Sequence, residues 1–168
     1  LSILMALCSR SFHSGCIVFV PTKQLAHKLR VILGLAGLSA GELHGDLSQG
    51  ERTAALERFK KAELDFLVCT DVAARGLDIP GVKSVLNYAM PVDYKQYLHR
   101  VGRTARAGKS GRSVSLVGES DRKTLKLVLK NAEIAPKQRL IDPAVLEEFR
   151  SRLQSMQQDV DELLEEER

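Results

Sequence analysis

The chain has 168 residues, of which 44% are hydrophobic and 27% are charged, and its formal net charge is +4. This composition is typical of an ordinary soluble domain with a sizeable core, and it excludes an intrinsically disordered chain. The charge is uneven, because residues 1–118 hold 16 lysines and arginines against 9 acidic residues, while residues 119–168 hold 9 against 12.

Five short runs rich in valine, isoleucine and leucine predict the strands of a buried sheet. In chain order they are Cys16–Val20, Glu42–Leu43 with its flanks, Phe66–Thr70, Val85–Tyr88 and Ser113–Val117.

Helical patterns separate these runs, and each begins at a residue that can cap a helix. The first starts at Thr22 and ends at Gly37, and the second starts at Ser48, which forms a capping box with Glu51. The third starts at Asp93, with Gln96 three residues later, and the fourth follows Asp121. Strands that alternate with crossover helices predict an α/β fold with an open, twisted, mostly parallel sheet. In such sheets ligands bind beyond the carboxyl ends of the strands.

The helix after Asp93 carries the most distinctive pattern. Arg100, Arg103 and Arg106 recur at three-residue spacing, and the stretch from Lys95 to Arg112 contains six basic residues and no acidic one. On one helix these guanidinium groups would fan across an outer edge and converge on a phosphate, which arginine binds through two parallel hydrogen bonds. A solvated basic face is the alternative. The expected core face of this helix is Tyr94, Leu98, Val101 and Ala105.

Polar segments follow the first three predicted strands, at residues 21–23, 44–46 and 70–78. Since the carboxyl ends of parallel strands share one edge, these segments should form one rim, with the arginines ending near it. Thr70 and Asp71 would open a turn whose backbone N–H groups and hydroxyl hold a phosphate. The alternatives are a simple helix cap at this pair and simple turn glycines at Gly45 and Gly76.

The three cysteines, Cys8, Cys16 and Cys69, lack the spacing of metal ligands, and no metal site is expected. They are interpreted as buried reduced thiols of an intracellular protein. No stretch is long enough to span a membrane, and the first eight residues lack the pattern of a signal peptide. The chain begins within an apolar helix-like run, which suggests an excised domain.

Four of these segments, in this order, resemble motifs IV, IVa, V and VI of the carboxy-terminal RecA-like domain of DEAD-box RNA helicases. The matching segments are residues 17–23, 44–52, 70–78 and 99–106. The resemblance covers roughly residues 1–132, and four ordered motifs are far more specific than any one. Pro21 and Ala105 depart from the family pattern, so an RNA contact by a side chain at position 21 is not expected.

The resemblance implies a role for each motif residue. Arg103 and Arg106 would act as arginine fingers on the γ-phosphate of ATP, and Asp78 would touch the ribose, with Gly76 beside the nucleotide. The residues implied to face the RNA backbone are Gln49, Arg52, Thr70 and Gly76. His99 and Arg100 would link the ATP site to the partner domain.

The sequence contains neither a Gly-x-x-x-x-Gly-Lys-[Ser/Thr] phosphate loop nor an Asp-Glu-Ala-Asp run. ATP and Mg²⁺ would therefore be held mainly by an amino-terminal RecA-like domain of the same protein. The chain is expected to be half of an active site, with RNA as its partner and no ATPase activity alone.

Residues 133–168 are interpreted as a helical tail after a domain of residues 1–132. Asp142 and Pro143 predict a helix start, and apolar residues follow at alternating spacings of three and four. They are Leu146, Phe149, Leu153, Met156, Val160 and Leu163. This stripe could bind a protein partner or a second copy, but its short length favours packing against the domain or a neighbouring segment.

Two other functions remain as alternatives: a DNA helicase or translocase domain, and a non-catalytic scaffold that binds RNA or protein. A scaffold would be expected to have lost Arg103 or Arg106, and both are present. Within the family, residues 41–45 and 113–119 look most like the nucleolar branch that assembles large ribosomal subunits. That similarity predicts a nuclear, nucleolar protein that acts in ribosome biogenesis.

Overall fold

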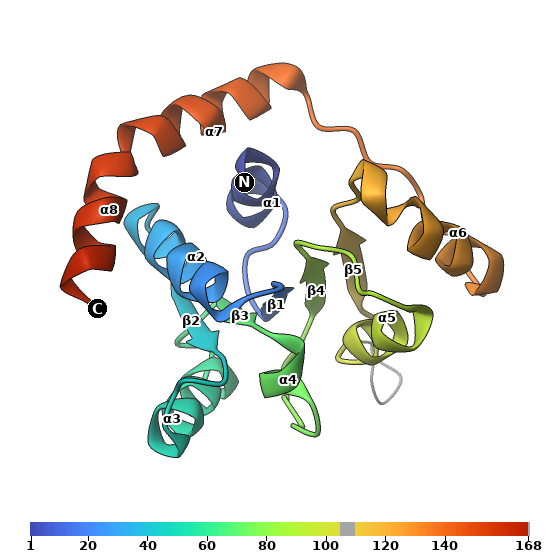
Figure 1. Ribbon diagram of the computed structural model, residues 1–168, viewed down its shortest axis with the longest axis horizontal. Helices are drawn as coiled ribbons and strands as arrows, with labels where there is room; N and C mark the ends of the chain where they lie inside the picture. The colour runs from blue at the N-terminus through green and yellow to red at the C-terminus, as the bar shows by residue number, and fades with distance from the viewer. Residues whose placement is uncertain (105–109, 168) are drawn as a thin grey trace.

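The computed structural model describes residues 1–104 and 110–167. Its centre is a five-stranded, all-parallel sheet with the strand order β2-β3-β1-β4-β5 (Figure 1). The strands are β1 (Cys16–Phe19), β2 (Ala40–Leu43), β3 (Phe66–Cys69), β4 (Ser84–Asn87) and β5 (Arg112–Ser115). The predicted α/β class and all five predicted strands are confirmed, with bounds that differ by one or two residues.

Helices cover both faces of this sheet. They are α1 (Ser2–Arg10), α2 (Lys23–Leu35), α3 (Gln49–Lys60), α4 (Asp71–Ala74), α5 (Tyr94–Val101), α6 (Arg122–Asn131), α7 (Pro143–Ser155) and α8 (Gln157–Glu166), with a short 3₁₀ helix at Glu119–Asp121. In Figure 1, α1 and α2 lie on one face and α3, α4 and α5 on the other. Successive strand side chains point to opposite faces, so Val18 belongs to one buried cluster and Ile17 to the other.

Three of the predicted helix starts are confirmed by capping hydrogen bonds, whereas Asp121 makes no side-chain capping bond to α6. Thr22 accepts from the backbone N–H of Leu25, and Asp93 accepts from that of Gln96. Ser48 and Glu51 form the complete capping box, which holds the pKa of the Glu51 carboxyl below its usual value. These caps stabilise the helices that begin at the polar rim.

The helix predicted to carry all three arginines is shorter than expected. It ends at Val101, so Arg103 lies in the following turn, and Arg106 falls outside the described residues. After Gly102 the chain turns inward, because Thr104 is buried and its hydroxyl donates to the carbonyl of Val82 at 3.2 Å.

The expected faces of that helix were also partly wrong. Arg100, expected outside the core face, is only 4% exposed, whereas Leu98, expected within it, is 47% exposed. The polar partners that bury Arg100 come from other elements, so helical periodicity alone does not reveal them.

The tail packs against the domain, as its short length predicted. It forms two helices, α7 and α8, which are separated at Met156. Phe149 and Val160 are buried in the same cluster as α1 and α2. Arg10 pairs with Glu148 at 2.6 Å, and Arg30 pairs with Glu167. Four of the six stripe residues, Phe149, Leu153, Met156 and Val160, therefore pack in the core cluster with α1 and α2.

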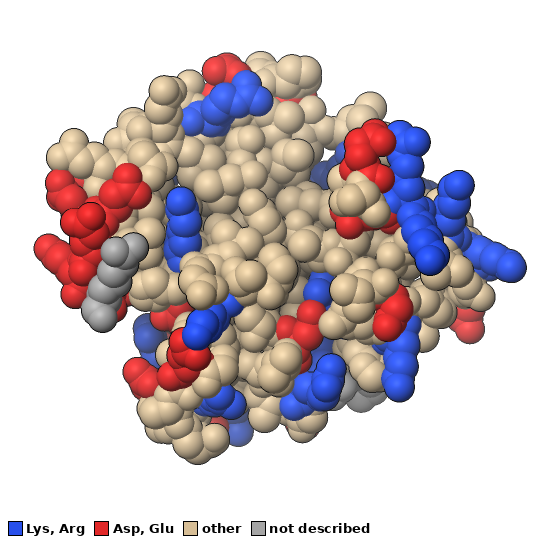
Figure 2. Space-filling model, in the orientation of Figure 1, with Lys and Arg blue, Asp and Glu red and all other residues tan. Residues whose placement is uncertain are grey.

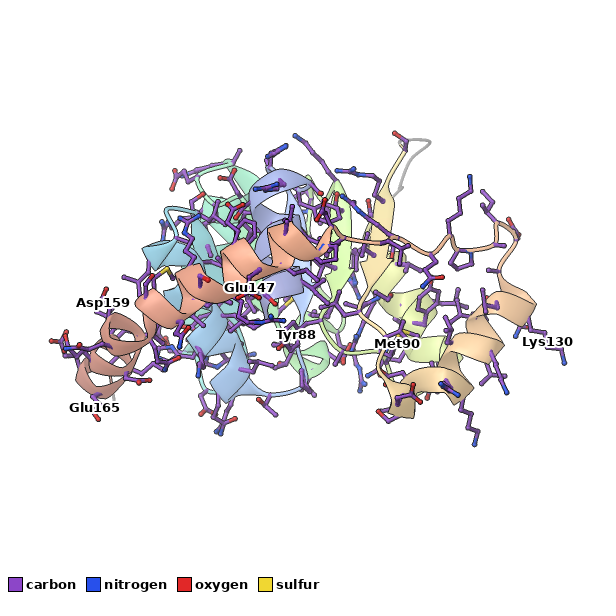
Figure 3. The ribbon with its side chains drawn as sticks, turned by 90° about the horizontal axis from the view of Figure 1, so that it is seen from above. Tyr88, Met90, Lys130, Glu147, Asp159 and Glu165 are labelled. Carbon is purple, nitrogen blue, oxygen red and sulfur yellow. The ribbon has the colours of Figure 1, made fainter. Side chains whose placement is uncertain are left out.

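The basic and acidic parts of residues 119–168 lie at opposite ends of the molecule (Figures 2 and 3). Basic side chains gather over α6, where Lys130 lies, while α8 carries Asp159 and Glu165 at the other end. The net negative charge counted for residues 119–168 thus hides a basic helix and an acidic one.

All three cysteines are free and buried, as predicted. Burial raises the pKa of the Cys8 thiol to about 12 and raises the pKa values of the Cys16 and Cys69 thiols as well. Buried thiols with raised pKa values are poor nucleophiles, so they serve as small core residues. Within the described residues, no helix is long and apolar enough to cross a membrane.

Candidate functional site

The polar segments predicted to form one rim do meet at the carboxyl edge of the sheet. The backbone N–H of Thr70 donates to the carbonyl of Leu43 at 3.2 Å, which joins the ends of β3 and β2. Lys23, after β1, pairs with Asp46, after β2, and this contact lowers the pKa of the Asp46 carboxyl. The parallel topology thus assembles segments that lie far apart in the sequence.

Among the described residues of this rim, Arg100 makes the most side-chain hydrogen bonds. Its Nε and Nη2 donate to the two carboxylate oxygens of Asp71 at 2.7 and 2.6 Å. Its Nη1 donates to the side-chain oxygen of Asn87 and to the carbonyl of Ala89. The guanidinium carbon also lies 5.1 Å from the ring centre of Phe19. Such a buried, bidentate pair joins α5 rigidly to α4 and to the ends of β1 and β4.

Arg103 approaches the loop that follows α4. Its Nη1 donates to the carbonyl of Leu77, between Gly76 and Asp78. The loop turns at Gly76, whose φ of +74° lies in the left-handed region that glycine adopts without strain. Asp78 is exposed, and Arg103 is partly exposed. Two residues that the resemblance assigns to the nucleotide, Arg103 and Asp78, therefore lie on adjacent segments.

A small hollow opens between α4 and α5 at the end of β1. Its lining includes Phe19, Arg75, His99 and Arg103. The hollow has a volume of about 30 Å³, far below the range of small-ligand pockets, about 300–1,000 Å³. Its cationic lining suits one phosphate group at the mouth, but the residues that the structure describes do not enclose a nucleotide.

The residues assigned to the RNA backbone lie along the same rim, on the side of β2 and β3. Gln49 is the first residue of α3 and is exposed. Arg52, one turn later, donates from Nη2 to the carbonyl of Gly45 at 2.9 Å and from Nε to that of Leu47 at 3.1 Å. It therefore braces the loop after β2 while remaining partly exposed.

Thr70 is the N-cap residue of α4, but its side chain makes no capping hydrogen bond. The simple-cap alternative for Thr70 and Asp71 is therefore incomplete, because the Asp71 carboxylate binds Arg100 instead of the helix end.

Sequence reasoning missed the structural role of Asp71 and of Asn87. Asn87 is fully buried at the end of β4, where its amide donates to Ser115 at 3.0 Å and its carbonyl accepts from Arg100. An asparagine inside an apolar strand was the available signal, since a buried polar group needs partners. Its partners come from β5 and α5, which local spacing does not identify.

Comparison with known proteins agrees with this architecture. The model of the helicase conserved C-terminal domain matches residues 1–108. The ATP-dependent RNA helicase DRS1 of Mycosarcoma maydis is 51% identical over 168 residues, which are 99% of this chain but only 18% of that protein. This chain thus spans about a fifth of the length of that relative.

Two solved structures are similar in fold as well as in sequence. The E. coli DEAD-box protein SrmB, bound to the regulator of ribonuclease activity A, is 40% identical with a TM-score of 0.75, and 84% of each chain is covered. Domain 2 of the Mss116p DEAD-box helicase, bound to an RNA duplex, is 34% identical with a TM-score of 0.68, over 85% of this chain and 58% of that one. The chain therefore belongs to the helicase conserved C-terminal domain family, as a carboxy-terminal RecA-like domain of the DEAD-box type.

Proposed function

We propose that this chain is the half of an ATP-dependent RNA helicase that supplies arginine fingers and part of the grip on an RNA strand. The observation that carries the proposal is the contact of Arg103 with the loop of Gly76 and Asp78, at the rim where the four motif segments meet. The relatives named as ATP-dependent RNA helicases support ATP and RNA as its ligands.

In this proposal Arg103 stabilises negative charge on the transferring phosphoryl group. ATP with Mg²⁺, bound by an amino-terminal domain, supplies the phosphoanhydride bond that is hydrolysed. Arg103 starts from a defined position, since its guanidinium is held at the Leu77 carbonyl and its backbone follows α5 directly. A positioned arginine is worth about 10³ to 10⁵ in rate. Arg106 is proposed as the second finger from the resemblance alone, because it lies outside the described residues.

Arg100 serves as a positioning residue in the same proposal. Its contacts with Asp71, Asn87 and Ala89 fix the end of α5, three residues before Arg103. His99 is exposed beside the small hollow and can face an opposing domain. The coupling role is accordingly divided: His99 touches the partner domain, and Arg100 transmits the position of α4 to α5.

The RNA strand would run along the loops after β2 and β3. Gln49 and Thr70 offer polar side chains there, Arg52 adds a positive charge, and Gly76 permits close approach of a strand because no atom lies within 4 Å of a Cβ built on it. These groups recognise sugar and phosphate and not base edges, so binding would be independent of base sequence.

The chain alone should have no ATPase activity above background, with or without RNA. The reason is that its 168 residues hold no phosphate loop and its rim hollow is too small for a nucleotide. Phosphate release by the purified chain, measured with saturating ATP and RNA, checks this. RNA-stimulated turnover by the chain itself would contradict the split-site proposal.

RNA should stimulate the ATPase of the intact protein far more than an all-DNA strand of the same sequence. The 2′-hydroxyl is the feature of a regular backbone that distinguishes the two, and the proposed track faces the backbone. Arg52→Ala should weaken RNA stimulation without abolishing nucleotide binding. Arg58→Ala is the matched control, since Arg58 lies on the same helix and is exposed. Equal stimulation by RNA and DNA would favour the DNA-motor alternative.

We further propose that the protein acts in ribosome biogenesis in the nucleolus. The support is the similarity of residues 41–45 and 113–119 to the nucleolar branch of the family, together with the high identity to the relative named DRS1.

A further inference from the structure

A second hollow lies at the opposite edge of the sheet from the motif rim. It has a volume of about 460 Å³ and opens at the amino ends of β1, β4 and β5. Its polar lining comes from the loop before β1, from the start of β4 and from the segment that enters β5. The side chains concerned are His13, Ser14, Lys83, Ser84, Ser110 and Arg112.

The charged groups of this hollow carry one sign. Among residues 1–104 and 110–167, neither Lys83 nor Arg112 has a carboxylate within 4.0 Å. The hydrogen bonds of both side chains go to neutral oxygens: Lys83 Nζ donates to the Ser14 hydroxyl at 3.0 Å, and Arg112 Nη2 donates to the Ser11 carbonyl at 2.8 Å. His13 also lines the hollow.

The cationic groups are also held in position. The guanidinium carbon of Arg112 lies 4.8 Å from the ring centre of Phe12, and Phe12 is only 1% exposed. Stacking on a buried ring and bonding to the Ser11 carbonyl hold the guanidinium at the border of the hollow. Arg139, from the segment before α7, bonds to the Ser11 hydroxyl at 2.5 Å and adds positive charge beside it.

We propose that this hollow binds the phosphate group of a small phosphorylated molecule, at a site separate from the nucleotide and RNA rim. A guanidinium, an ammonium group and serine hydroxyls are the donors that hold a phosphate dianion. The volume falls within the range of small-ligand pockets, about 300–1,000 Å³. A nucleic-acid backbone, in contrast, is bound along an extended groove, so a recessed hollow with clustered cations favours the small ligand.

The test uses the isotopically labelled 168-residue chain titrated with inorganic phosphate and with tripolyphosphate, followed by amide chemical shifts. We expect saturable shifts concentrated at Ser14, Ser84 and Gly111, with tripolyphosphate binding more tightly. The double variant Lys83→Gln/Arg112→Gln should weaken binding at least tenfold. The control variant Lys123→Gln/Lys126→Gln removes the same charge from exposed positions of α6 and should change affinity less than twofold.

Three outcomes would overturn the proposal. One is non-saturable shifts spread over all basic surfaces, and another is equal weakening by both double variants. The third is a single-stranded RNA that shifts the same amides more strongly than tripolyphosphate, which would make the hollow part of an RNA path. If Arg112→Gln perturbs the fold, the single variant Lys83→Gln replaces the double variant. It should still weaken tripolyphosphate binding measurably, because Lys83 is exposed and its backbone contacts are unchanged. Unchanged affinity in Lys83→Gln would likewise overturn the proposal.

Discussion

Replacing Arg103 by alanine in the intact protein is expected to lower kcat by about 10³ or more while ATP affinity changes only a few-fold. The guanidinium would act on charge that develops during phosphoryl transfer, whereas ground-state ATP would be held mainly by the other domain. Steady-state ATPase kinetics at saturating RNA, together with equilibrium nucleotide binding, separate the two quantities.

Arg103→Lys should restore little of the lost rate, because an ammonium group cannot reproduce the two parallel hydrogen bonds of a guanidinium. Arg122→Ala is the control, since Arg122 is exposed on α6 and pairs only at the surface with Glu119. Near-normal turnover in Arg103→Ala would transfer the proposed role to Arg106 or remove it altogether.

Asp71→Ala is expected to destabilise the chain by roughly 3–5 kcal/mol, the usual cost of leaving one partner of a buried ion pair alone. Arg100 is 4% exposed and would lose both of its charged hydrogen bonds to Asp71. Chemical denaturation of the wild-type and variant chains measures the loss of unfolding free energy. The dependence of that free energy on denaturant concentration should have the same slope in both chains.

The double variant Asp71→Ala/Arg100→Met should recover much of that stability, because it removes the unpaired charge together with its partner. The same double variant in the intact protein should still have low ATPase activity, since α5 would no longer be tied to α4. Glu147→Ala removes an exposed pair with Arg150 on α7 and should leave the unfolding midpoint unchanged. A single Asp71→Ala variant as stable as wild type would show that the pair is not structural.

The sequence by itself determined the alternation of strands and helices, the cap residues and the edge of the sheet at which the site would form. These features depend on local physics: a buried parallel strand needs a short apolar run, and a helix start needs an acceptor for its unpaired N–H groups. Thr22, Ser48 and Asp93 act at distances of three residues along the chain, so their partners can be read from spacing.

Only the tertiary structure decided which charged residues are buried and what they bind. Arg100 and Asp71 are 29 positions apart, and they meet because β3 and β4 lie on either side of β1 in the sheet order. A second contact between distant positions accompanies the early end of α5, where the buried Thr104 donates to the Val82 carbonyl 22 positions away. Helical periodicity describes one element in isolation, whereas burial of a guanidinium depends on acceptors that other elements bring to it.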